Sequence, residues 1–163
     1  GINVKYVERS DVNYIYDEIY SCSEMLVHKL PSRASFELNT GNIITSVSGN
    51  SVGTPKHASA YVTEEFESAV CTNGFAVLDI NKSAIDPYYL LYFMKTKYFL
   101  NQVFRLRTGA AIPAVNHKDL EEILIHIPSK NEVKDISSII KKGFEEREIF
   151  KQKLKLIIES LNH

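Results

Sequence analysis

Short apolar runs rich in β-branched and aromatic residues recur along the first half of the chain. Such runs predict β-strands, and they cover residues 4–7, 43–47, 59–63 and 69–80. Glycines at 41, 49 and 53 border the second run and permit tight turns and close backbone approach there. The first half is therefore expected to contain several strands joined by short loops.

Two segments of this half follow other patterns. Apolar residues between positions 11 and 30 recur at intervals of three or four, which predicts a helix whose apolar face is Ile15, Ile19, Cys22 and Leu26. The polar stretch 31–40 is expected to form a loop. Asn73-Gly74 interrupts the last apolar run and indicates a hairpin or bulge, because both residues tolerate positive φ.

A second helix is predicted to begin at Asp86-Pro87. The Asp side chain can accept from the first free amides, and Pro loses no hydrogen bond at the first helical position. Its apolar stripe is expected to lie in the core and comprises Leu90, Leu91, Met94, Tyr98 and Val103.

The segment after this helix is expected to change from loop to strand. A loop centred on Gly109 comes first, and a short turn follows at residues 117–121. The alternating sequence at residues 123–128 predicts a half-buried strand, with His126 on the opposite face from Ile125 and Ile127.

A long amphipathic helix is predicted to begin at Ser129, where Ser and Glu132 have the spacing of a capping box. Extended to Leu161, it is about 48 Å long. Gly143 and Arg147 interrupt an apolar heptad seam. The seam consists of Val133, Ile136, Ile140, Phe150, Leu154, Ile157 and Leu161. A partner helix is the expected cover for this seam, and packing of the helix back onto its own domain is the alternative.

Composition supports one globular domain over residues 1–128, with residues 129–163 as a helical module for dimerisation or spacing. The chain has 163 residues, 44% hydrophobic and 24% charged, which is enough for one sizeable core. Its two cysteines, Cys22 and Cys71, are too few for a disulfide framework. No apolar run approaches the roughly 20 residues of a membrane span. A cytoplasmic protein without membrane contact is expected.

Local charge is more informative than the net charge of -1. Between Pro87 and Lys118 the chain has no acidic residue, and its basic residues are Lys95, Lys97, Arg105, Arg107 and Lys118. Such a stretch is typical of a surface that contacts nucleic-acid phosphates. An ordinary solvated helix face is the alternative explanation.

Two sequence patterns suggest catalysis only weakly. Asp86-Pro87-Tyr88-Tyr89 is similar to the Asp/Asn-Pro-Pro-aromatic motif of adenine amino methyltransferases but lacks the second Pro, and the chain has no Gly-rich cofactor loop after a strand. The loose spacing of a nuclease metal site occurs at Asp119, Glu132 and Lys134. However, Glu132 and Lys134 fall at the predicted start of a helix, whereas such a site would place them on a strand. A non-catalytic protein without cofactor or metal is therefore expected, and a small metal-dependent nuclease remains the alternative.

Taken in order, several weak motifs resemble the target recognition domain of Type I restriction-modification specificity subunits. They are GNIITSVSGNSVG, AVCTNGFAVLDI, IDPYYLLYFMKTKYFLNQ, RTGAAIPAVNHKDLEEILIHIP and SKNEV. The chain departs from the family pattern at Asn42, Ala110 and Val133, and it lacks a second Pro after Pro128. These departures leave open a fused methyltransferase-specificity protein as the parent.

The resemblance implies an α+β fold, with a curved and mostly antiparallel sheet, packed helices and a long C-terminal coiled-coil helix. It implies sequence-specific binding of double-stranded DNA, which directs adenine methylation and restriction by a Type I system. The implied partners are DNA, a methyltransferase (modification) subunit, and a second recognition half or a second copy of the chain that covers the seam.

The candidate DNA-binding residues divide into two groups. The five basic residues named above are candidates for phosphate contact. Polar residues on Gly-flanked loops are candidates for reading base edges, with Arg107 as a possible guanine contact, and they are Ser46, Ser48, Asn50, Asn73, Thr108, Gly109 and Asn116. The loop 105–109 is the leading candidate.

Overall fold

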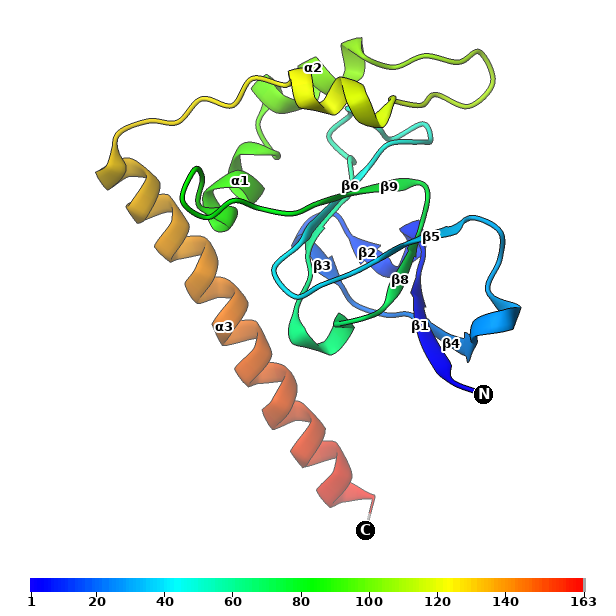
Figure 1. Cartoon of the computed structure of the whole chain (residues 1–163). Helices are drawn as coiled ribbons and strands as arrows, with labels where there is room; N and C mark the ends of the chain where they lie inside the picture. Colours follow the sequence, from blue (N-terminus) through cyan, green and yellow to red (C-terminus); the bar gives the residue numbers. More distant parts are fainter. Residues whose placement is uncertain (163) are drawn as a thin grey trace.

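The strands form two sheets in the computed structural model, which describes residues 1–162 (Figure 1). The four-stranded sheet has the order β4 (Ser23–Leu26), β1 (Asn3–Val7), β8 (Val70–Thr72), β5 (Ala34–Glu37). The five-stranded sheet has the order β2 (Val12–Asn13), β3 (Glu18–Ile19), β7 (Ser59–Tyr61), β6 (Ile43–Ser46), β9 (Phe75–Leu78). Each sheet has one parallel pair, β1 with β8 and β3 with β7, and the other pairs are antiparallel.

Helices follow the strands along the chain. They are α1 (Pro87–Phe93), α2 (Lys97–Arg105) and α3 (Lys130–Leu161), with 3-10 turns η1 (Arg9–Asp11), η2 (Val27–Lys29), η3 (Glu64–Phe66) and η4 (His117–Glu122). Helix α3 forms a rod that extends past the body of the domain (Figure 1). The expected α+β class and long C-terminal helix are confirmed, with the strands divided between two sheets.

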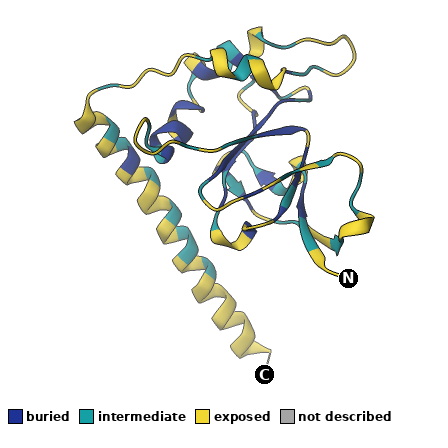
Figure 2. Cartoon of the chain, in the orientation of Figure 1, coloured by how far each residue is buried: buried dark blue, intermediate teal, exposed yellow. Residues whose placement is uncertain are grey.

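Two apolar cores hold this arrangement together. One includes residues of both sheets, among them Val7, Ile44 and Phe75, each fully buried. The other joins the five-stranded sheet to the helices, and its members include Ile43 and Leu91. Strand β6 and most of α1 are dark in the burial view, β4 and β5 are lighter, and most of α3 is exposed (Figure 2). The loops at the sheet edges are therefore carried on a well-packed scaffold.

The helix predicted between residues 11 and 30 is wrong. This segment forms η1, β2, β3, β4 and η2, with a turn in which Asp17 has a φ of 53°. Positive φ ends any right-handed helix, and the Asp17 carbonyl instead accepts from Tyr61 N–H at 3.1 Å. Ile19 is buried while Ile15 is 56% exposed, so the three-to-four spacing did not mark one buried face.

Two other local predictions in the first half are also wrong. Residues 34–37 form β5, which pairs with β8 through a register shift, rather than a loop. Asn73-Gly74 does not join a hairpin, because β8 and β9 belong to different sheets, and neither residue has positive φ. The predicted strands at 4–7, 43–47 and 59–63 are confirmed within a residue or two as β1, β6 and β7.

The start of the second helix is confirmed, but its continuity is not. Asp86 caps α1 by accepting from the Tyr88 and Tyr89 amides, with Pro87 at the first position. The helix ends at Phe93, whose carbonyl accepts from the Thr96 hydroxyl at 2.6 Å, and α2 begins at Lys97. Of the predicted stripe, Tyr98 is 65% exposed and the other four residues are buried.

The strand predicted at residues 123–128 is wrong, and a side chain explains its extended conformation. The Gln102 amide donates to the Leu124 carbonyl at 2.9 Å and accepts from the Leu124 N–H at 2.8 Å. A single side-chain amide thus forms the two hydrogen bonds at Leu124 that a neighbouring strand would otherwise form. The Ser129 cap is confirmed, because its hydroxyl accepts from the Glu132 N–H at 3.3 Å. The predicted helical module ends at His163, which lies outside the described residues.

Candidate nucleic-acid interface

Backbone hydrogen bonds join loops from three distant parts of the chain along one edge of the domain. Val47 N–H donates to the Gly74 carbonyl at 2.8 Å, and the Val47 carbonyl accepts from Val115 N–H at 2.7 Å. Gly49 N–H donates to Pro113 O at 2.8 Å. Three of the predicted base-reading residues, Ser48, Asn73 and Thr108, therefore lie on neighbouring strands and loops of this edge.

The loop 105–114 closes on itself and is anchored to the body. Thr108 and Ala114 exchange two backbone hydrogen bonds, of 2.8 and 2.9 Å. Gly109 has a φ of 96°, and a Cβ there would lie 2.7 Å from the Ile112 carbonyl oxygen, so only glycine fits. The Arg107 guanidinium donates to Val52 O at 3.2 Å and lies 4.5 Å from the Phe104 ring centre. This arginine is consequently half-buried and held in one orientation.

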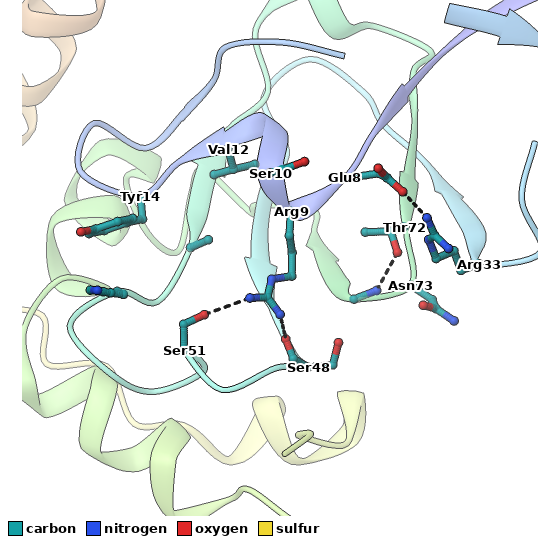
Figure 3. Close-up of a pocket in the computed structure, with 13 residues that line it drawn as sticks. Glu8, Arg9, Ser10, Val12, Tyr14, Arg33, Ser48, Ser51, Thr72 and Asn73 are labelled. Atoms are coloured by element: carbon teal, nitrogen blue, oxygen red, sulfur yellow. Dashed lines mark hydrogen bonds and ion pairs between the residues drawn. The ribbon is translucent and has the colours of Figure 1, made fainter. Parts of the chain in front are cut away.

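A groove of about 720 Å³ lies beside this edge (Figure 3). Three basic side chains line it, Arg9, Arg33 and Lys56, together with the predicted Ser48 and Asn73. Its one carboxylate, Glu8, forms an ion pair with Arg33. The groove therefore combines excess positive charge with polar side chains that can form hydrogen bonds.

The buried His57 side chain holds the loop 49–57 through hydrogen bonds of its ring nitrogens. Its Nδ1 accepts from Gly53 N–H at 3.0 Å, which leaves Nε2–H to donate to Thr45 Oγ1 at 2.7 Å. Burial, with a smaller contribution from the charge of Arg9, lowers the pKa of His57 to about 4. The imidazole is therefore neutral near pH 7 and keeps this tautomer, which ties the backbone of the loop at Gly53 to Thr45 of β6.

The remaining predicted residues occupy varied positions. Lys95 pairs with Asp17 at 3.1 Å and donates to Tyr14 O at 2.8 Å, so it connects α1 and α2 to the β2–β3 turn. The Ser46 side chain is fully buried, which removes it from the surface. Asn116 caps η4 by accepting from Lys118 N–H at 2.9 Å. Lys95 and Asn116 are exposed despite these contacts, and Asn50, Lys97, Arg105 and Lys118 are exposed as well.

Arg9, Arg33 and Lys56 are the residues that the sequence pattern did not reveal. None lies in a basic cluster like the one between Lys95 and Lys118. Arg33 is near Lys29 alone, Lys56 has no Lys or Arg close to it, and Arg9 follows directly after Glu8. The sheets bring them together. Gly49 was the one available signal, because its missing side chain admits the Arg9 guanidinium.

Helix α3 divides into a docked half and a free half. Val133, Ile136 and Phe144 pack against the second core, and Ser137 donates to Asp86 Oδ1 at 2.6 Å. The other seam residues become exposed toward the C-terminal end, since Phe150 is 62% and Leu161 79% exposed. The alternative of packing onto the domain is confirmed for the first half of the helix, and the second half leaves its apolar residues uncovered.

Glu18 fastens α3 at the boundary between its two halves. Arg147 Nε lies 3.0 Å from the Glu18 carboxylate, and Lys151 pairs with the same oxygen. Arg147 also donates to Tyr16 O at 3.1 Å. Nε finds no acceptor in hydrogen-bond geometry among the described residues, so its contact with Glu18 is electrostatic.

The residues that the sequence suggested for catalysis lie in helix caps and helical turns. The Asp86 carboxylate is occupied by the α1 amides and Ser137. Asp119 lies in η4 and Glu132 in the first turn of α3. Within residues 1–162, no three His, Cys, Asp or Glu side chains gather in a group that could hold a metal ion. Over the same residues, no helix has the length and apolar character to cross a membrane.

Comparison with known proteins gives a consistent result. The model of a family described as Type I restriction modification DNA specificity domain matches residues 2–159. A search of curated proteins found no match.

Two solved structures share the fold. One is described as the crystal structure of the HsdS subunit from Thermoanaerobacter tengcongensis, with a TM-score of 0.72 and 24% identity over 94% of this chain. The other comes from a structure described as the basis of complex assembly and conformational transition of the type I R-M system, with a TM-score of 0.73 and 24% identity over 95% of this chain. The match spans 39% of each of those chains. On the extent of the family match, this chain belongs to the Type I restriction modification DNA specificity domain family.

Proposed function

We propose that this chain is a sequence-specific recognition domain for double-stranded DNA, within the specificity subunit of a Type I restriction-modification system. The observation that carries the proposal is the edge where loops 47–53, 73–74 and 105–115 are joined by backbone hydrogen bonds. Base reading needs polar side chains on a rigid support, and these loops combine both. Family membership agrees with this role.

Within the proposal, exposed basic residues position the DNA and loop residues read it. Lys97, Arg105 and Lys118 are exposed and contact phosphates, while Ser48, Asn50, Asn73 and Thr108 face base edges. Arg107 adds a guanidinium with a fixed orientation. Lys95 and Ser46 do not belong to this contact set, because the first is paired with Asp17 and the second is buried.

The free half of α3 supplies the partner surface in this proposal. Phe150, Leu154, Ile157 and Leu161 repeat at coiled-coil spacing, and each is at least 42% exposed. A second recognition half, or a second copy of this chain, covers them and sets the distance between two DNA half-sites. Methylation and cleavage belong to other subunits, to which this chain contributes no catalytic group.

Salt titration tests the electrostatic part of the proposal. Each phosphate neutralised on duplex DNA contributes about 0.9 to the slope of log affinity against log salt concentration. Arg105→Gln and Lys118→Gln are each expected to reduce that slope by about 0.9, measured by fluorescence anisotropy with a labelled duplex. Lys153→Gln removes one charge on the free half of α3 and is expected to leave the slope unchanged.

Selection of bound duplexes from a random pool tests specificity. An enriched motif is expected from the wild-type chain. A salt-independent affinity, or a pool that stays random even when the partner half is supplied, would count against DNA recognition by this domain.

A further inference from the structure

Arg9 occupies a position that only a glycine neighbour allows. Its Nη1 donates to the Ser48 carbonyl at 2.8 Å, and its Nη2 donates to Ser51 Oγ at 3.3 Å (Figure 3). A Cβ on Gly49 would lie 1.7 Å from Nη1 and 2.7 Å from Cζ. The φ of Gly49 is 106°, a conformation that other residues rarely adopt. The turn 48–51 is therefore shaped around this guanidinium.

The guanidinium is fixed, yet much of its hydrogen-bonding capacity is unused. An arginine has five N–H donors, and two of them are engaged by Ser48 and Ser51. The other three find no acceptor among the described residues. No carboxylate among residues 1–162 lies within ion-pair distance of Arg9, whereas the neighbouring Arg33 is paired with Glu8. Arg9 thus presents an oriented cation with open donors to the groove.

The surroundings favour a base edge over a phosphate. A phosphate contact requires a positive charge but little orientation, and flexible lysines supply it. Bidentate recognition of guanine directs N–H groups at both O6 and N7, and a guanidinium supplies two of them in a fixed planar geometry. A guanidinium held by two hydrogen bonds loses less side-chain entropy on binding. Lys56 lines the same groove and can contact a backbone phosphate.

We propose that Arg9 is a specificity-determining residue of this chain and reads a guanine through the groove lined by Arg9, Ser48 and Asn73. This rests on the proposed function and assigns part of its specificity to the N-terminal segment, outside the loop 105–109. Ser48 and Ser51 are positioning residues, since they hold the guanidinium through their carbonyl and hydroxyl oxygens. Gly49 is required because any side chain there displaces the guanidinium.

The experiment compares wild type with Arg9→Met, which keeps an unbranched side chain but removes every N–H donor. Duplexes selected by the wild type are expected to contain a guanine that the variant no longer prefers. A bidentate contact discriminates by about 1–3 kcal/mol, which corresponds to a loss of preference of about 5- to 150-fold. The salt slope is expected to stay the same, because a base contact neutralises no phosphate, whereas loss of a phosphate contact would lower it by about 0.9. Circular dichroism and thermal melting of both proteins verify the fold.

A modified duplex makes the test independent of folding. Replacing the selected guanine with 7-deazaguanine removes the N7 acceptor, and it is expected to weaken binding of the wild type about fivefold or more while leaving Arg9→Met unaffected. If both proteins select the same sequence and respond equally to the modified base, Arg9 does not read guanine. A wild type that enriches no sequence overturns the proposed function as well, so the two failures are distinguishable.

Discussion

The two halves of α3 carry similar apolar spacing but have opposite environments. In the docked half, Phe144 lies 6.0 Å from Tyr88 and 5.9 Å from Tyr61 between ring centres, and Arg147 lies 4.4 Å above its ring. In the free half, Phe150 lies six residues after Phe144 and is 62% exposed. The apolar heptad spacing occurs on both sides of Gly143 and Arg147, so that spacing does not show where the body ends.

Charge marks the boundary that apolar spacing does not. Arg147 interrupts the seam at a position where a coiled coil has an apolar residue, and it pairs with Glu18 of β3. Lys151 pairs with the same carboxylate one turn later. Beyond Lys151 every described residue of α3 is exposed. The comparison shows that polar interruptions in a heptad can mark the place where a helix leaves its own domain.

The largest expected effect concerns the free half. Leu154→Ser with Ile157→Ser removes two large apolar side chains from the proposed interface, each contributing about 1.5–3 kcal/mol when buried. The dissociation constant for pairing of two chains is expected to rise at least about 100-fold, measured by sedimentation equilibrium. The thermal stability of the monomer is expected to remain the same, because both residues are exposed.

Lys153→Ser is the matched control, since Lys153 lies on the same stretch of helix outside the apolar seam, and it is expected to leave association unchanged. Equal weakening by both variants would show that helix content, rather than the seam, governs association. A wild type that stays monomeric alone but pairs with a second recognition half would assign the seam to that half.

An intermediate effect is expected in the docked half. Phe144→Ala should lower the free energy of unfolding by about 2–3 kcal/mol, which is below the range for a fully buried Phe because this ring is half-buried. Urea denaturation followed by circular dichroism measures it. Phe150→Ala makes the same chemical change on the free half, and at dilute, monomeric concentrations it is expected to cost less than about 0.5 kcal/mol. Equal costs at both positions would mean that the two halves do not differ.

The smallest expected effect is a change of stability with pH at Asp17, in the β2–β3 turn that Arg147 of α3 contacts. Burial raises the pKa of Asp17 from 3.8 to about 6, although Lys95 and, more weakly, Arg147 act to lower it. The folded state then binds more protons than the unfolded state between about pH 4 and 6. The contribution of Asp17 to stability is therefore present below pH 4 and is lost as the pH rises to 6, by at most about 1.4 kcal/mol per pH unit.

Asp17→Asn tests this sign, because Asn tolerates the positive φ at this turn. The stability of the variant relative to wild type is expected to increase between pH 4 and 6, measured by urea denaturation at fixed ionic strength. The comparison with wild type is essential, because His57 has a lowered pKa and contributes the opposite slope over the same range. A constant difference across this range would mean that the Asp17 pKa is not raised.

Local signals allowed the helix starts to be predicted from sequence. Asp86-Pro87 and Ser129 act through atoms within three residues of themselves, so tertiary packing does not alter them. The segment 11–30 failed because its apolar residues face different surroundings, and a positive φ at Asp17 turned the chain. The strand predicted at 123–128 failed because Gln102, more than twenty residues earlier, supplied the hydrogen bonds that a neighbouring strand would have supplied.

The candidate site was predictable only in part, for the same reason. Asn50, Asn73, Thr108 and the loop around Gly109 have local turn signals, and these mark exposed polar positions. Burial of Ser46 and pairing of Lys95 with Asp17 depend on residues distant in the sequence. Arg33 and Lys56 had no signal in the sequence, and the only signal for Arg9 was the distant Gly49.

The sequence alone determined the caps of α1 and α3, the length of α3 and the Gly109 loop, because these depend on contacts within a few residues and on apolar periodicity. The α+β class followed from the family resemblance. Only the tertiary structure decided the division into two sheets, the point where α3 leaves the body and the groove around Arg9. Each of these depends on which distant segments share a hydrogen bond or a buried charge. The Glu18 contact with Arg147 and the Ser48 contact with Arg9 are two such cases, and both join residues far apart along the chain.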